Sequence, residues 1–465
     1  MTFEQDLNKI FKAYDVRGIV PDQLNAGQVF AIGAAFARFV KGTENASRVA
    51  VGYDMRESSK VLKKAFIAGV HLEGCEVVEI GLASTDLLYF TSGKLNMPGV
   101  MITASHNPAK YNGLKFCASM ARPIGQETGL ENIKAAAAEI LGQYGSEDMA
   151  QKIAADKGGE EKNMIEDFVQ HVHGFVEIAK LKHFKVVADT ANGMGGLIAP
   201  AIFKGLPVDL EILYPELDGT FPNHPASPIE PENLVDLQKE VLATGADVGL
   251  AFDGDADRVF LIDDKGVPLS GSATTAIVAK FMLETHPGAT VLYNCICSKA
   301  VPEIVAEMGG KSVRTRVGHS FIKGEMARTG AVFGGEHSGH YYFLDNFKAD
   351  SGIIAAIVVL GVLSKAGIPL SELRVPYERY ADSGEINTEV KDVREVLAGI
   401  KETYSAQGAT IDELDGLTVD SGSWWFNLRP SNTEPLLRLN VEAKDEAALE
   451  VHVNRVRDQI KDMSR

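Results

Sequence analysis

The sequence is poor in basic residues relative to acidic ones. Its 465 residues include 46 Lys and Arg against 63 Asp and Glu, which gives a formal net charge of -17. This balance argues against general nucleic-acid binding, because such binding needs a basic face. An anionic substrate would have to be attracted by a local cluster of Arg, Lys and backbone N–H groups, since the overall field repels it.

Cysteines and long apolar runs are also scarce. The four cysteines suggest no disulfide framework, and Cys295-x-Cys297 is one residue too tight for a redox or zinc Cys-x-x-Cys site. The N-terminus lacks a basic region followed by an apolar one. The longest apolar run, residues 353–363, is too short to span a membrane and predicts a buried helix. We therefore expect a protein of the reducing cytoplasm with no membrane partner.

The length predicts three or four domains. Hydrophobic strands alternate with helical segments, which indicates an α/β fold with parallel or mixed sheets. Three times, a short hydrophobic strand closes a βαβαβ-like unit and leads into a polar loop. The tail, joined near residues 369–380, predicts a smaller α+β module with a hairpin.

Locally, residues 15–18 predict a turn, and Ser58 or Ser59 predicts the N-cap of a helix.

The apolar segment 99–102 leads to Ser105, which stands directly before a His-Asn-Pro turn. In an α/β chain, the loop after the carboxyl end of a strand is where ligands meet the protein. A serine held there can be a nucleophile or a phosphate carrier, although ordinary turn chemistry is the alternative. Lys115 follows closely and can act as a general acid or base if burial or nearby cations lower its pKa; an exposed lysine is the alternative.

Three aspartates alternate along one loop: Asp253, Asp255 and Asp257. Alternate carboxylates on a tight loop can point at one hard cation, and oxygen ligands suit Mg²⁺ or Ca²⁺. An EF-hand is excluded because Arg258 replaces its obligatory glycine and the flanks predict strands. A solvated acidic turn is the alternative, but three such carboxylates repel one another if they are partly buried. The loop therefore predicts a metal site with positions open for a phosphate oxygen, as is common for Mg²⁺.

Three further polar loops carry candidate ligand groups. Gly318-His319-Ser320 lies at a strand-to-helix turn, where N–H groups can bind an anion. The segment 336–340 alternates acceptors and donors suited to sugar hydroxyls, and its spacing fits no common structural zinc site. The segment 429–434 combines a guanidinium with small polar side chains, which suits a phosphate; a simple hairpin turn is the alternative.

Together these motifs resemble those of the α-D-phosphohexomutase superfamily, with the phosphomannomutase/phosphoglucomutase group as the closest match. Residues 103–108 look like its phosphoserine loop and residues 253–258 like its metal loop. Residues 335–340 look like its sugar-binding loop and residues 429–433 like its phosphate-binding loop. The resemblance implies four domains around a central cleft, three of them similar mixed α/β domains. We expect these domains at residues 1–155, 160–262, 263–372 and 373–465.

The resemblance also implies a reaction, the interconversion of hexose 6-phosphate and hexose 1-phosphate. A phosphoserine at Ser105 would donate its phosphoryl group to the substrate, giving a hexose 1,6-bisphosphate that turns over in the cleft. One Mg²⁺ would be held by Ser105, Asp253, Asp255 and Asp257. The implied catalytic residues are Ser105, Lys115, Arg17, His319 and His340. The implied substrate-binding residues are Tyr14, Arg258, Glu336, Ser338, Arg429, Ser431, Asn432 and Thr433.

The resemblance leaves the sugar and the assembly open. The substrate would be a phosphate of mannose, glucose or both, bound by a monomer or homodimer. Ile296 stands where many members carry a basic residue, and Lys299 is the nearby cation that could compensate. His337 stands where phosphoglucosamine mutases usually carry Gln, which disfavours that alternative. A metal-dependent sugar phosphatase is one alternative, but it would need no phosphate-binding loop opposite Ser105, so the Arg429 loop argues against it. A non-catalytic sugar-phosphate binding protein is another, but it would need no nucleophile, so Ser105 and the three aspartates argue against it.

Overall fold

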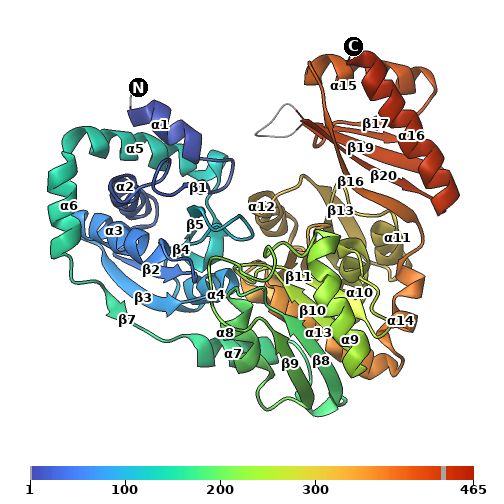
Figure 1. Cartoon of the computed structure of the whole chain (residues 1–465), viewed down its shortest axis with the longest axis horizontal. Helices are drawn as coiled ribbons and strands as arrows, with labels where there is room; N and C mark the ends of the chain where they lie inside the picture. The colour runs from blue at the N-terminus through green and yellow to red at the C-terminus, as the bar shows by residue number, and fades with distance from the viewer. Residues whose placement is uncertain (1–2, 431–435, 465) are drawn as a thin grey trace.

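The computed structural model describes residues 3–430 and 436–464, and its strands form four separate sheets (Figure 1). Three sheets are mixed and carry helices, and the fourth is entirely antiparallel. This confirms the predicted fold class of three mixed α/β domains followed by a smaller α+β domain. The first domain lies at the left of Figure 1 and the fourth at its upper right.

The first sheet has the strand order β1-β5-β4-β2-β3-β7, with β6 paired to β5. Its strands are β1 (Val16–Ile19), β2 (Arg48–Tyr53), β3 (Glu76–Leu82), β4 (Gly99–Ile102), β5 (Tyr111–Ala118), β6 (Arg122–Pro123) and β7 (Glu160–Glu161). Its helices are α1 (Phe3–Ile10), α2 (Ala26–Glu44), α3 (Ser59–Leu72), α4 (Thr85–Leu95), α5 (Leu130–Gln143) and α6 (Ser146–Ala155), with short turns η1 (Ser119–Ala121) and η2 (Gln126–Thr128).

The second and third sheets have four strands each. The second region contains α7 (Ile165–His173), η3 (Ile178–Lys180), β8 (Phe184–Asp189), α8 (Gly195–Phe203), β9 (Val208–Leu213), η4 (Pro231–Leu234), α9 (Val235–Thr244), β10 (Val248–Phe252) and β11 (Val259–Asp263). The third contains α10 (Gly271–Thr285), β12 (Thr290–Asn294), α11 (Ala300–Glu307), β13 (Lys311–Thr315), α12 (His319–Thr329), β14 (Phe333–Gly335), β15 (Tyr341–Phe343), η5 (Leu344–Asn346), α13 (Gly352–Ala366), α14 (Leu370–Leu373) and η6 (Val375–Tyr377).

The fourth sheet has the order β16-β20-β19-β18-β17 and is covered by two helices. Its elements are β16 (Ala381–Glu389), α15 (Val393–Ala406), β17 (Thr410–Asp412), β18 (Leu417–Asp420), β19 (Trp424–Pro430), β20 (Leu436–Ala443) and α16 (Glu446–Met463). Strands β19 and β20 pair antiparallel from Trp424 to Pro430, which confirms the predicted hairpin.

The three mixed sheets repeat one strand arrangement, as the sequence pattern predicted. The orders β5-β4-β2-β3, β11-β10-β8-β9 and β15-β14-β12-β13 correspond strand by strand. In each, the first-named pair is antiparallel and the other two pairs are parallel. The Ser105 loop, the aspartate loop and the 336–340 loop therefore occupy the same position in their sheets, between the two strands of the antiparallel pair.

One local prediction was wrong. Arg17 and Gly18 lie in strand β1, where Arg17 pairs with Gly113 of β5, and they form no turn. The sequence near Arg17 gives no sign of a strand partner almost a hundred residues away. Helix α3 begins at Ser59 and Ser58 occupies its N-cap position, as predicted, although Ser58 has helical backbone angles and makes no side-chain cap bond. The Ser59 hydroxyl instead donates to Asp54 Oδ1 at 2.6 Å.

The apolar run 353–363 forms most of α13, whose residues Gly352 to Leu360 are buried, as predicted. Within residues 3–430 and 436–464, no single helix is long and apolar enough to cross a membrane. One helix pair bent by 88°, Gly352–Ala366 with Leu370–Tyr377, passes the test by length and composition.

Candidate active site

The Ser105 side chain is buried between two loops that come from different sheets. Its hydroxyl donates to Asp253 Oδ2 at 2.8 Å and accepts from Arg258 Nη2 at 2.8 Å. Ser105 has a φ of 50°, a left-handed backbone conformation that is uncommon for residues other than glycine and that recurs at functional sites. The structure thus brings the predicted nucleophile directly against the predicted metal loop.

Arg56 binds the main chain of the Ser105 loop, and Arg56 was not among the predicted site residues. Its side chain is only 1% exposed, and its guanidinium forms an ion pair with Asp54 at 3.1 Å. It also donates to four main-chain carbonyl oxygens of the same loop: Ser105 at 2.8 Å, Asn107 at 2.6 Å, Pro108 at 3.0 Å and Tyr111 at 3.1 Å. A polar Asp-x-Arg directly after strand β2 was the available signal, because strand ends in α/β sheets carry functional groups.

Asp253, Asp255 and Asp257, the residues of the predicted metal loop, offer one oxygen each within 4.8 Å of one another. They are almost fully buried. The Oδ1 atoms of Asp255 and Asp257 have no hydrogen-bond partner, which is costly for a buried carboxylate. Burial and the two neighbouring carboxylates raise the pKa of Asp253 well above its ordinary value. A divalent cation ligated by these oxygens would offset that repulsion, so the residues fit a hard cation such as Mg²⁺.

Lys115 lies inside this cluster and is buried, so the alternative of an exposed lysine is wrong. Its ammonium donates to Asp255 Oδ2 at 2.7 Å and to Asp257 Oδ2 at 2.6 Å. Burial by itself would lower the pKa of Lys115, but the aspartates outweigh it and raise the pKa above its ordinary value. An acid–base role was predicted for Lys115 on the condition that its pKa is lowered, and that condition is not met in this state.

Arg17 and Tyr14 meet the site from the first domain. Arg17 donates to the side chain of Asn107, two residues beyond Ser105, and to Asp15 Oδ2 at 2.6 Å. The Tyr14 ring packs edge-on against the His319 ring, with 4.8 Å between centroids. His319 is the first residue of α12, and neither of its buried ring nitrogens has a hydrogen-bond partner. Burial, with Lys323 nearby, lowers the pKa of His319 well below its ordinary value, so the ring is neutral near pH 7.

The 336–340 loop contacts the predicted metal loop through both main chain and side chain. Arg258 and His340 form an antiparallel bridge, and His340 Nε2 lies 3.7 Å from Asp257 Oδ1. The Ser338 hydroxyl lies 2.9 Å from His340 Nδ1. The carboxylate of Glu336 accepts bonds from Tyr342 Oη at 2.7 Å and from the backbone N–H of Gly318 at 3.0 Å.

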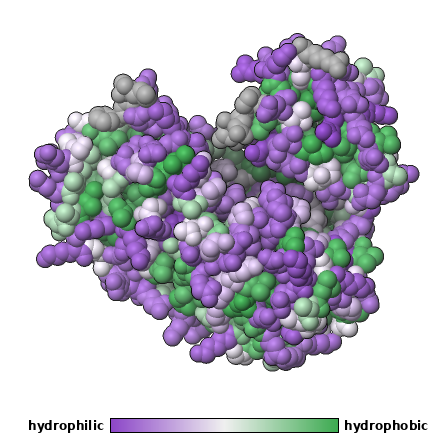
Figure 2. Space-filling view, in the orientation of Figure 1, coloured by the Kyte–Doolittle hydropathy of each residue, from purple (hydrophilic) through white to green (hydrophobic). Residues whose placement is uncertain are grey.

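Arg429 is buried at the end of β19 in the fourth domain. Its Nη2 lies 3.2 Å from Glu385 Oε2, and its Nε has no hydrogen-bond partner. The remaining predicted residues of the phosphate-binding loop, Ser431, Asn432 and Thr433, lie outside the described residues. Figure 2 shows a hollow between the first and fourth domains on the face that it presents.

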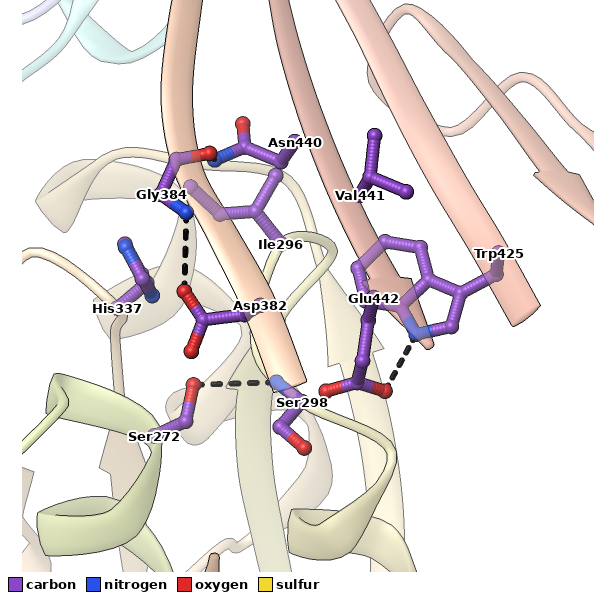
Figure 3. A pocket seen from close by; sticks show the side chains of 10 residues that line it. All are labelled: Ser272, Ile296, Ser298, His337, Asp382, Gly384, Trp425, Asn440, Val441 and Glu442. Atoms are coloured by element: carbon purple, nitrogen blue, oxygen red, sulfur yellow. Dashed lines mark hydrogen bonds between the residues drawn. The ribbon is translucent and has the colours of Figure 1, made fainter. Parts of the chain in front are cut away.

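Ile296 lines a small pocket between the third and fourth domains, together with His337 and Trp425 (Figure 3). The cation proposed to compensate for Ile296 is used elsewhere. Lys299 Nζ donates to Asp420 Oδ1 at 2.8 Å and to the carbonyl oxygen of Gly422 at 3.2 Å, both in the fourth domain. Lys299 therefore joins the two domains and supplies no free charge beside Ile296.

Comparisons with known proteins agree with this architecture. Four family models match in order, described as Phosphoglucomutase/phosphomannomutase alpha/beta/alpha domain I at residues 8–143, domain II at residues 166–266, domain III at residues 270–380, and C-terminal domain at residues 381–460. Together these matches cover most of the chain.

Similar proteins include mutases from several bacteria. A protein named "Phosphohexose mutases" from Xanthomonas campestris pv. campestris is 38% identical over 441 residues, covering 94% of this chain and 96% of that protein. A "Phosphomannomutase" from Escherichia coli (strain K12) is 35% identical over 447 residues, again covering 94% and 96%. The crystal structure of a phosphoglucomutase/phosphomannomutase family protein from Burkholderia thailandensis superposes with a TM-score of 0.86 at 28% identity, covering 100% of this chain and 97% of that one.

Proposed function

The chain belongs to the phosphoglucomutase/phosphomannomutase family, and on that basis we propose that it interconverts hexose 6-phosphate and hexose 1-phosphate through a phosphoserine at Ser105. The observation that carries the proposal is the position of the Ser105 hydroxyl, 2.8 Å from both Asp253 Oδ2 and Arg258 Nη2. A buried serine between a carboxylate cluster and a guanidinium suits a group that takes up and releases a phosphoryl group.

Asp253, Asp255 and Asp257 would hold the cation together with a phosphoryl oxygen on Ser105. All of these donors are oxygen atoms, which favours Mg²⁺. Mg²⁺ bound there would polarise the phosphoryl group and neutralise charge on its oxygens. Arg258 would stabilise the negative charge that develops on Ser105 Oγ when the phosphoryl group departs.

Two phosphoryl transfers complete the reaction. In the first, the bond between Ser105 Oγ and phosphorus breaks while the free hydroxyl oxygen of the substrate bonds to phosphorus. The proton of that hydroxyl passes to Nε2 of His340, whose pKa is lowered by burial so that the ring is neutral. The hexose 1,6-bisphosphate then turns over. Ser105 Oγ takes the other phosphoryl group, and His340 returns a proton to the sugar oxygen that is released.

The sugar would be held at both ends. Glu336 and Ser338 would bind the O3 and O4 hydroxyls, and Arg429, with Ser431, Asn432 and Thr433, would bind the distal phosphate. Mannose and glucose differ at C2, a position that these contacts leave untouched. We therefore propose that both hexose phosphates are substrates.

Phosphorus NMR tests the proposal, because one spectrum resolves the 6-phosphate, the 1-phosphate and inorganic phosphate. Mannose 1-phosphate or glucose 1-phosphate, supplied with Mg²⁺ and a trace of the hexose 1,6-bisphosphate, should convert to the 6-phosphate. Ser105→Ala should abolish the conversion. Accumulation of inorganic phosphate instead would show a phosphatase, and conversion of glucosamine phosphate alone would show an amino-sugar mutase.

A further inference from the structure

Helix α4 is the buried element on which the three α/β domains meet. Every residue from Thr85 to Gly93 is buried, so α4 has no solvent face in its first two turns. Asp86 accepts a hydrogen bond at 2.6 Å from Ser351 of the third domain. Phe90 packs against Phe168 of the second domain and Phe347 of the third. The position of α4 is therefore fixed from several sides.

The first residue of α4 reaches the metal loop. The Thr85 hydroxyl donates to Asp255 Oδ2 at 2.5 Å, and its backbone N–H donates to the Asp255 carbonyl oxygen at 3.0 Å. Asp255 is thereby hydrogen-bonded through its side-chain Oδ2 and its main-chain carbonyl oxygen to a buried helix of another domain. Thr85 lies 170 residues before Asp255 in the chain, and the sequence analysis did not identify it.

The two carboxylate oxygens of Asp255 differ in their surroundings. Oδ2 accepts from the Thr85 hydroxyl at 2.5 Å and from the Lys115 ammonium at 2.7 Å. Oδ1 is buried and has no hydrogen-bond partner. A carboxylate fixed at one oxygen has a defined orientation for the other, and the free oxygen is the one available to a cation.

We propose that Thr85 is a positioning residue of the metal site: its hydroxyl fixes Asp255 so that Oδ1 faces the cation. The inference rests on the proposed function only in placing a divalent cation at Asp253, Asp255 and Asp257. Thr85 itself acts through Asp255. Because α4 packs within its own domain and against the second and third domains, it holds Asp255 at a fixed position relative to the Ser105 loop.

Variants of Thr85 and one control variant isolate the contribution of the Thr85 hydroxyl. Thr85→Val keeps the shape and the backbone N–H bond but removes the donor to Oδ2, and Thr85→Ser restores that donor. Thr91→Val is the matched control, because Thr91 is buried in the same helix and its hydroxyl donates at 2.8 Å to the Leu87 carbonyl oxygen, away from the metal loop. Thr85→Ala serves as a second test of the hydroxyl if Thr85→Val does not fold.

The measurement is calorimetric titration of each full-length protein with MgCl₂ in the absence of sugar phosphate. Outer-sphere partners of metal ligands commonly change metal affinity by about 10- to 100-fold. We expect Thr85→Val to weaken Mg²⁺ binding by at least about tenfold, while Thr85→Ser and Thr91→Val stay close to the wild type. In activity assays, Thr85→Val should lower kcat at sub-saturating Mg²⁺ and recover at high Mg²⁺, with KM for the sugar phosphate unchanged.

Three results would overturn the inference in distinguishable ways. If folded Thr85→Val binds Mg²⁺ as tightly as the wild type, Thr85 does not position the site, and the proposed function stands. If the wild type itself binds no Mg²⁺, the cation site is wrong, and the inference falls together with the metal part of the proposed function. Equal weakening by Thr91→Val would show a general effect of helix packing and would also reject the role of Thr85.

Discussion

A β-carbon on Gly254 would lie under 3.0 Å from the carbonyl oxygen of Ser105. The loop of the three aspartates and the Ser105 loop therefore touch through their main chains, and only glycine leaves room for this approach. The close contact brings Asp253 Oδ2 within 2.8 Å of the Ser105 hydroxyl.

Gly254→Ala should separate the two loops by a few tenths of an ångström or more. Because the reacting oxygen and the metal ligands would no longer be in register, we expect kcat to fall by roughly 100-fold. Steady-state kinetics measures this effect. Gly42→Ala is the control, since a β-carbon there meets nothing within 4 Å, and its activity should match the wild type. Near-normal kcat for Gly254→Ala would show that the register is not critical.

Arg56→Lys should loosen the Ser105 loop. A lysine has three donors at one point and cannot reproduce the contacts of the planar guanidinium with Asp54 and four carbonyl oxygens. We expect a loss of about 1–3 kcal/mol in stability and a lower kcat, measured by thermal unfolding and kinetics. Arg48→Lys is the control, because the Arg48 side chain is 40% exposed. Equal behaviour of the two variants would contradict the role assigned to Arg56.

Lys115→Met should make the folded protein more dependent on a divalent cation. Without the ammonium, Asp255 and Asp257 lose the charge that compensates them, which for a buried ion pair costs about 3–5 kcal/mol. Added Mg²⁺ should restore much of this loss, so the rise in Tm with Mg²⁺ should exceed that of the wild type. Thermal unfolding in EDTA and in MgCl₂ gives the comparison. An unchanged Mg²⁺ effect would mean that the cation binds elsewhere.

Asp86→Asn should change the pH dependence of stability. Burial raises the pKa of Asp86 from 3.8 to about 7, and the hydroxyls of Ser351 and Ser84 only partly oppose the shift. Between pH 3.8 and about pH 7 the folded protein keeps the Asp86 proton that the unfolded chain has released. The free energy of unfolding therefore falls as the pH rises through this range. The loss amounts to about 4 kcal/mol in total. The Tm of Asp86→Asn minus that of the wild type should therefore increase from pH 4 to pH 7 in EDTA. A constant difference would show that Asp86 stays ionised.

Local sequence pattern predicted the strands well where they are short hydrophobic runs between polar loops. Residues 184–189 and 290–294 are such runs, and they form β8 and β12. Such runs are buried on the faces of a sheet, and the burial is visible in composition alone. The same reasoning placed Ser105 and the three aspartates at strand ends, and the repeated topology brings those ends together.

The supporting residues could not be predicted because their partners are distant in the chain. Arg56 bonds a loop about fifty residues away, and Thr85 bonds Asp255 170 residues away. Neither contact leaves a local periodicity. The direction of the pKa shift of Lys115 could not be predicted for the same reason, since it depends on carboxylates from another sheet. Lys299 likewise pairs with a strand of the fourth domain that the sequence did not associate with it.

The most direct test of the account is the mass of the intact protein after exposure to a hexose 1,6-bisphosphate and Mg²⁺. The wild type should carry one phosphoryl group, and a subsequent incubation with excess hexose 1-phosphate should remove part of it. Ser105→Ala should remain unmodified throughout. A wild type that gains no phosphoryl group, or a Ser105→Ala variant that gains one, would contradict the assignment of Ser105 as the phosphoryl carrier.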